Sequence, residues 1–256
     1  MPTLLSLVGG RWIDRIGVRR PLFVGTGLMV LGGVVAYAHY DLWTFFVTST
    51  LVGSGFLLSQ LVVQKMTGDM GQTADQRRLL FGMLAIGYSI SGVLGPFSSG
   101  VLYDTIGGDR TFLSLGGLAL LVMAWLFLRR HSLPGPAAEM PVQRRFSDLL
   151  KTPELRRLYL AVGLISSAWD VHQFVVPIYG RSIGLSGTQV GMVLAAFGLA
   201  TLIVRLVLPL LRSLTEWRAI FCAQLVGAVV YAFYPIFEKY EVLMGLSFAL
   251  GLGLGI

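Results

Sequence analysis

The chain has 256 residues, of which 55% are hydrophobic and 13% charged, and its mean hydropathy is +0.74. An ordinary soluble domain is about 45–50% apolar and about 25% charged, so this composition excludes a soluble globular fold and indicates a polytopic membrane protein. The formal net charge of +7 would suggest nucleic-acid binding in a soluble protein, but the placement of the basic residues argues against that partner. The single cysteine implies no disulfide framework.

Apolar runs long enough to cross a bilayer, which takes about 20 residues for roughly 30 Å of hydrocarbon, recur along the chain. We predict seven complete transmembrane helices, at residues 22–38, 42–64, 79–103, 111–128, 158–179, 189–211 and 219–237. Apolar segments at residues 1–10 and 242–256 flank this series. Each flanking segment is typical of part of a further helix.

The basic residues lie almost entirely on one side of the predicted membrane. Sixteen of the twenty fall in the segment after residue 10 and in alternate loops, whereas the opposite loops hold only Arg110, Arg181 and Lys239. Cytoplasmic loops are enriched in lysine and arginine, so we assign the basic side to the cytoplasm. Aromatic residues mark the two interfaces in the same register, with Tyr231 and Tyr234 among those predicted at outer ends.

A weak internal repeat relates the two halves of the chain. A shift of 198 residues places Arg20 on Arg218 and Met1 on Leu199, in the middle of a predicted helix. We therefore expect a fragment, truncated at both ends, or a misassigned start. The expected fold is an all-α polytopic membrane protein with two pseudo-repeated helical bundles joined by a cytoplasmic loop. We predict an N-terminal bundle at 1–128, a cytoplasmic linker at 129–157 and a C-terminal bundle at 158–256.

The charged segment after residue 10 carries a specific motif. Its residues are Gly10, Asp14, Arg15, Gly17, Arg19, Arg20 and Pro21. They resemble the G-x-x-x-D-R-x-G-x-R-R/P signature of the major facilitator superfamily, found there in the cytoplasmic loop between helices two and three. The resemblance covers the whole chain and implies helices three to nine complete, with parts of helices two and ten.

This charged loop is a candidate gate. Gly10 and Gly17 permit close approach and a tight turn, and Asp14 can accept hydrogen bonds from arginines or from the N-terminus of a neighbouring helix. Such contacts can form in one conformation and break in another. The alternative is that the arginines act only as topology signals.

The predicted helix at 79–103 has a face almost bare of side chains. Gly92, Pro96 and Gly100 recur every fourth residue, and Gly95 and Ser99 belong to a parallel stripe. Another helix can pack very close to such a face, and Pro96 removes one backbone hydrogen bond and favours a kink. The stretch is similar to the G-P motif in helix five of the family's antiporters, with Ser99 where glycine is usual. Ordinary tight packing is the alternative interpretation.

The predicted helix at 158–179 contains the candidate substrate and proton site. Its residues are Ser166, Trp169, Asp170, His172 and Gln173. Ser166, Asp170 and Gln173 share one helical face, and an ionisable group at that depth usually faces a water-accessible cavity. His172 points about 200° away from Asp170 around the helix. A buried hydrogen-bonded pair that joins helices is the alternative.

Trp169 lies away from the predicted interfaces and is a candidate ligand contact. The resemblance places this helix, as the seventh, beside the family's central cavity. Arg205 lies within the predicted helix at 189–211, where it either reaches the interface or pairs with a carboxylate, and its role stays open.

The function that follows from the resemblance is secondary active transport by alternating access. We expect proton-coupled export of a small organic or drug-like molecule by an antiporter that is a monomer in the plasma membrane, the inner membrane in a bacterium. A proton-coupled importer of a small metabolite and a truncated inactive membrane protein are the alternatives. H-E-x-x-H, P-loop and clustered Cys/His motifs are absent from the sequence, so we expect neither an enzyme nor a bound cofactor or metal.

The predicted topology can be tested by cysteine labelling in intact cells. With Cys222→Ser as background, a cysteine placed at Gly135 should be cytoplasmic and protected from a membrane-impermeant maleimide. A cysteine at Gly184 should be external and react. The reverse pattern would contradict the helix assignment.

Overall fold

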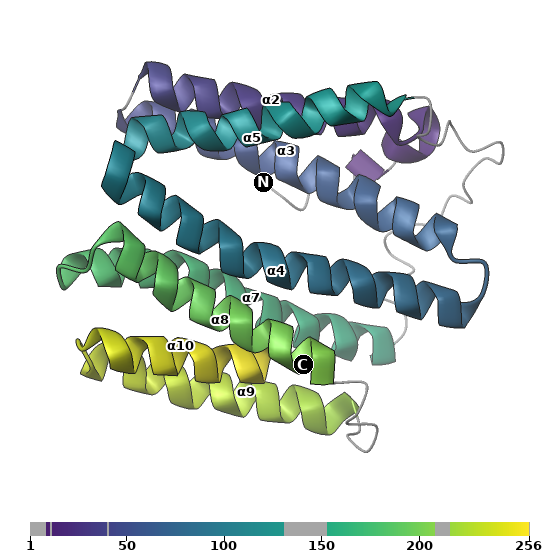
Figure 1. The fold of residues 1–256 in the computed structure, drawn as a ribbon. Helices are drawn as coiled ribbons and strands as arrows, with labels where there is room; N and C mark the ends of the chain where they lie inside the picture. Colours follow the sequence, from purple (N-terminus) through teal and green to yellow (C-terminus); the bar gives the residue numbers. More distant parts are fainter. Residues whose placement is uncertain (1–8, 11, 40, 131–152, 208–215, 256) are drawn as a thin grey trace. The chain divides into compact units, whose positions relative to one another are not determined.

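A computed structural model describes residues 9–10, 12–39, 41–130, 153–207 and 216–255 (Figure 1). Every regular element within these ranges is helical. The elements are α2 (Arg19–Ala38), α3 (Leu42–Met70), α4 (Ala74–Ile106), α5 (Gly108–Leu128), α7 (Pro153–Ser182), α8 (Gly187–Val207), α9 (Glu216–Phe233), the 3₁₀ helix η3 (Tyr234–Ile236) and α10 (Tyr240–Leu254). Residues 9–10 and 12–16 are helical as well.

The described residues of all seven predicted transmembrane segments are helical apart from Phe237, which confirms the all-α fold class. The segment predicted at 219–237 is not one continuous α-helix, because α9 ends at Phe233 and η3 follows with Pro235 in its first turn. Proline has no backbone N–H to donate and its ring clashes with the preceding turn, so an α-helix does not continue through it without a kink. The end of the segment predicted at 189–211 lies outside the described residues.

Five described helices are long and apolar enough to cross a membrane by length and composition: α2, α3, α4, α5 and α8. The stretch Ile220–Ile236 and α10 are shorter apolar helices. Although α7 has 30 residues, it is not among the five, because charged and polar side chains such as Asp170 and Gln173 interrupt its apolar surface.

The described residues form two compact units. The first comprises those up to Phe81 together with α5, and the second comprises Gly82–Thr105 together with α7, α8, α9 and α10. The long helix α4 therefore contributes to both units. The predicted bundle limits at residues 128 and 158 stay a prediction.

In the first unit, α2 packs against both α3 and α5. Gly25 of α2 lies against Gly55 of α3, and Gly33 lies against Gly116 of α5. At each of these contacts a methyl group on α2 would collide with main-chain atoms of the neighbouring helix. Small residues let helix backbones approach closely, which is how helices associate in hydrocarbon.

The second unit is built around α8, which packs against α10 and α7. Phe197 of α8 is completely buried at its centre, together with Val193, Leu243 and Leu250. Residues of α8, η3 and α10 together cover one face of α7, at His172.

Asp41 begins α3 as its N-cap, with its carboxylate 2.7 Å from the backbone N of Thr44. This hydrogen bond and a second one from the Thr44 side chain hold the pKa of the Asp41 carboxyl below its usual value. A folded-state pKa below the unfolded value means that the cap stabilises the helix at neutral pH and that this contribution is lost as the pH falls.

The packing of α2 on α5 generates a paired test. A Cβ at Gly33 would lie 2.8 Å from both Gly116 Cα and Phe112 O, so Gly33→Ala should lower the stability of the purified protein by about 1–3 kcal/mol. A Cβ at Gly27 meets nothing within 4 Å, so Gly27→Ala should raise stability by up to about 1 kcal/mol through helix propensity. Thermal unfolding in detergent measures both, and shifts of the same sign would contradict the packing.

Candidate functional site

The two faces of α7 have different surroundings. Ser166 and Asp170 are exposed and Gln173 is half-buried, so the helices of their own unit leave the predicted polar face largely open. His172 and Val176 on the other face are buried. The structure therefore separates the five predicted residues into an uncovered group with Asp170 and a packed group with His172.

Trp169 joins the packed group. Its ring is half-buried and meets the ring of Phe197 edge-on, with centroids 4.5 Å apart. An edge-to-face contact of this kind fixes the orientation of an aromatic side chain. Trp169 thus lies between the core of the unit and the open face that carries Asp170.

His172 is completely buried in a small polar cluster. Its ring lies 4.7 Å from the ring of Phe197, and its Nε2 lies 3.4 Å from the hydroxyl oxygen of Ser247 on α10. The same Ser247 oxygen lies 2.6 Å from the hydroxyl oxygen of Tyr234. Nδ1 of His172 has no hydrogen-bond partner among the described residues. The cluster connects α7, η3 and α10 by hydrogen bonds within an apolar core.

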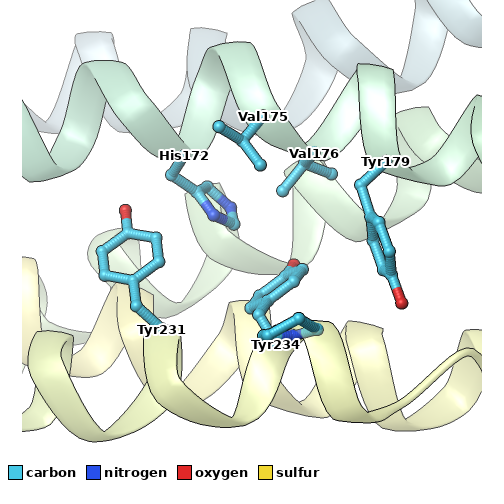
Figure 2. Close-up of a pocket in the computed structure, with 7 residues that line it drawn as sticks. His172, Val175, Val176, Tyr179, Tyr231 and Tyr234 are labelled. Carbon is cyan, nitrogen blue, oxygen red and sulfur yellow. The ribbon is translucent and has the colours of Figure 1, made fainter.

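A cavity of about 230 Å³ borders this cluster. It is lined by His172, Val175, Val176, Tyr179, Tyr231, Tyr234 and Pro235. Figure 2 shows the His172 ring extending from α7 toward the two tyrosines Tyr231 and Tyr234. The hydroxyl of Tyr231 donates to the backbone oxygen of Ala168, so its polar end is paired. The cavity therefore has mainly apolar walls.

The sequence-based interpretation missed Tyr234 and Ser247. Tyr234 was predicted near an outer helix end, and it does follow the end of α9, but its side chain is packed, because only 6% of the residue is exposed and its hydroxyl bonds to Ser247. Tyr231 and Tyr234 are three residues apart, and residues at that spacing share one helix face. That spacing, with a lone serine in the apolar run of α10, was the available signal.

The charged loop is organised by an ion pair. Asp14 lies 2.5 Å from the ammonium nitrogen of Lys65 on α3, and both side chains are about one-third exposed. Lys65 was not among the predicted partners of Asp14, which were the loop arginines or a helix N-terminus, and those contacts stay a prediction. Lys65 lies outside the motif, 51 residues further along the chain, so the motif did not point to it.

The other motif residues shape the loop. Gly17 is buried with φ +79°, a conformation that side chains rarely adopt, and its N–H donates to Ile13 O at 3.0 Å. Gly10 is helical and half-buried. Arg15, Arg19 and Arg20 are exposed, which leaves them available for topology signalling as well as for contacts with other segments.

The bare face of α4 packs against α8. A Cβ at Gly191 of α8 would collide with Pro96 O, and a Cβ at Gly198 would lie 2.5 Å from Gly92 O. Gly100 lies against Gly187 in the same way. The contact uses only one of the two predicted stripes, since a Cβ at Gly95 would meet nothing within 4 Å.

Arg205 of α8 donates through Nη1 to Ala85 O and to the Ser89 hydroxyl of α4, both at 2.6 Å. The ion pairs found between described residues do not include Arg205. Its partners are therefore neutral oxygens, and the predicted pairing with a carboxylate is not seen. No cluster of three or more His, Cys, Asp or Glu that could hold a metal ion occurs within the described ranges.

Comparison with known proteins decides the family. A sequence model described as the Major Facilitator Superfamily matches residues 1–256. The chain belongs to the major facilitator superfamily. This family consists of secondary transporters, so the predicted family and membrane-transport class are confirmed.

Two curated transporters of this superfamily illustrate the range of related proteins. A probable sugar efflux transporter of Helicobacter acinonychis (strain Sheeba) is 25% identical over 194 residues, which cover 73% of this chain and 47% of that protein. The vesicular acetylcholine transporter of Mus musculus is 27% identical over 117 residues, covering 46% and 22%. The chain thus spans about half the length of the first relative and less than a quarter of the length of the second.

A solved structure shows the same fold. The crystal structure of the peptide transporter POT in complex with alafosfalin matches with a TM-score of 0.66 at 16% identity, covering 100% of this chain and 69% of that chain. This likeness places the described helices in the fold of the superfamily.

The Asp14–Lys65 pair can be tested by charge exchange in the full-length transporter. Asp14→Asn and Lys65→Gln should each lower the transport rate about threefold to fivefold without affecting membrane insertion, as expected for loss of a partly exposed pair that contributes about 1 kcal/mol. The double exchange Asp14→Lys with Lys65→Asp should recover part of the loss. Unchanged transport in both single variants would reduce the loop to a topology signal.

Proposed function

We propose that this transporter exports a small organic molecule in exchange for protons, and that Asp170 is the proton-coupling group. The chain then acts by alternating access, with the open face of α7 bordering the substrate path. Ser166 and Gln173 supply neutral hydrogen-bonding groups on that face, and Trp169 supplies an aromatic surface beside it. We place the protein in the plasma membrane, the inner membrane in a bacterium.

The observation that carries the proposal is the position of Asp170. It lies 17 residues after the start of α7 at Pro153 and 12 before its end at Ser182, and its side chain is exposed from its own unit. The other acidic residues of the labelled helices lie within two residues of a helix end. A carboxylate at mid-helix depth is costly in hydrocarbon, so it is expected to face water or a ligand.

The chemistry of a carboxylate suits coupling. A desolvated carboxyl group favours the protonated form, and water or a nearby cation favours the ionised form. If the surroundings of Asp170 alternate between these conditions as the path opens to each side, the group takes up a proton on one side and releases it on the other. His172 is less suited to this task because it is enclosed by Phe197 and Ser247.

The relatives support export but leave the substrate class broad. One is named as a probable sugar efflux transporter and another as a vesicular acetylcholine transporter. A sugar is a neutral polyol-like compound, whereas acetylcholine is a cation. We therefore propose a small organic molecule without narrowing the class. The similarity of the α4 glycine–proline stretch to the family's antiporters supports exchange rather than symport.

The coupling role of Asp170 is tested in vesicles that contain the full-length protein. With an imposed pH gradient and a panel of sugars, quaternary amines and dyes, the wild-type protein should move at least one compound. Asp170→Asn should reduce gradient-driven transport to the level of empty vesicles, because an amide cannot exchange a proton, while substrate binding or exchange persists.

Two matched variants control for indirect effects. Glu241→Gln removes a carboxylate from the start of α10 in the same unit and should leave coupling intact. His172→Gln should lower thermal stability, since it disturbs the buried cluster, but should keep the dependence on the pH gradient. Normal gradient-driven transport by Asp170→Asn would overturn the coupling assignment.

A further inference from the structure

The contact between α4 and α8 has an unusual distribution of polar groups. The two helices run antiparallel, with Gly100 against Gly187 at one end and Gly92 against Gly198 further along. We call this contact the α4–α8 seam. Hydrogen bonds that involve charged side chains join the two helices at both ends of the seam, and between these ends glycines of α8 lie against main-chain atoms of α4.

In the middle of the seam, glycines bring the two main chains into contact and a proline removes a backbone hydrogen bond. Pro96 has no N–H, so the carbonyl of Gly92 one turn earlier lacks its usual helical donor. Gly198 presents its Cα to that carbonyl, and any side chain at this position would collide with Gly92. Such Cα–H···O contacts are weak, so this part of the seam has no strong polar tie.

Asp104 ties the outer end of the seam. Its Oδ1 accepts from the backbone N of Gly187 at 2.9 Å, and its Oδ2 accepts from the backbone N and the hydroxyl of Thr188, both at 2.7 Å. Gly187 and Thr188 are the first residues of α8, whose N–H groups have no partner within the helix. A carboxylate also interacts favourably with the positive end of the helix dipole.

Arg205 joins the two helices at the inner end of the seam, with the roles of the helices reversed. Here α8 provides the charge and α4 the acceptors, through the Ala85 carbonyl and the Ser89 hydroxyl. Ser89 is almost fully buried, with 2% exposed, so the guanidinium reaches into the contact rather than along its edge. Among the described residues, one charged side chain forms the hydrogen bonds between the two helices at each end of the seam.

We propose that the hydrogen bonds of Asp104 and those of Arg205, which we call the two ties, break in turn during transport. The Asp104 bonds break when the path opens to the outside, and the Arg205 bonds break when it opens to the cytoplasm. This proposal rests on the alternating-access function proposed above. Both are positioning residues, since they act on the distance between two helices and not on the substrate. With both ties formed, the seam is closed along its length.

The location of each tie explains how it can be released. Asp104 and the start of α8 lie at the outer helix ends, where water can replace the three hydrogen bonds. Arg205 lies two residues before Val207, the last described residue of α8, and its long side chain can extend toward the inner interface when it leaves Ala85 and Ser89. The acceptors of Arg205 are neutral oxygens, which favours this release, because no buried carboxylate is left unpaired when the guanidinium leaves.

The test measures two distances in full-length protein with Cys222→Ser, by electron–electron resonance between spin labels. The outer pair is Thr105 of α4 with Met192 of α8, and the inner pair is Met83 of α4 with Leu206 of α8, all four exposed. Asp104→Asn should lengthen the outer distance by several ångströms and leave the inner distance unchanged or shorter. Arg205→Gln should do the opposite. A merely structural role would loosen both pairs in both variants.

A charge-matched control is Asp109→Asn at the start of α5, which should move neither distance. If Asp104→Asn does not fold, Thr188→Val removes one donor to the same carboxylate and should give a smaller shift in the same direction. The same direction of change in Asp104→Asn and Arg205→Gln, or no change in either, would overturn the proposal. Transport by the wild-type protein is assayed separately, so its absence would count against the proposed function and not against the two ties.

Discussion

The hydrocarbon of a bilayer provides no hydrogen bonds, and each backbone N–H or C=O group left unpaired there costs several kcal/mol. Every described regular element of this chain is helical, and hydroxyl side chains within the helices bond to their own backbone. Thr26 donates to Leu22 O at 2.9 Å, and Ser167 donates to Gly163 O at 2.8 Å. Since most polar groups are satisfied locally, Asp170 and His172 stand out as groups that need surroundings of another kind.

The same constraint explains why so much of the fold was predictable. A helix that must cover the hydrocarbon needs a long apolar run, so run length alone located the helices. The direction assigned to them from the basic loops stays a prediction. The exceptions were chain segments in which local chemistry overrides hydropathy. Pro235 ends α9 within an apolar stretch, and the polar residues of α7 reduce its apolar character although the helix itself is 30 residues long.

The candidate site was only partly predictable, because helix periodicity assigns residues to faces but does not say what covers each face. Helix periodicity correctly predicted that Asp170 and His172 point to different sides of α7. It could not reveal that Ser247, 75 residues further along the chain, meets His172, or that Lys65 meets Asp14 across 51 residues. Asp104 belonged to no motif, because a carboxylate at a helix end has no periodic signature. Contacts of this kind depend on tertiary packing.

The main-chain character of the α4–α8 seam affects the kinetics of any separation between the two helices. Interdigitated side chains must change rotamers before they part, and each vacated hole must refill, which raises the activation barrier. Gly92 and Gly198 have no rotamers to change, and their separation leaves no hole shaped for a side chain. For the opening proposed above, the hydrogen bonds at the ends of the seam should therefore contribute more to the barrier than side-chain rearrangement at its glycines.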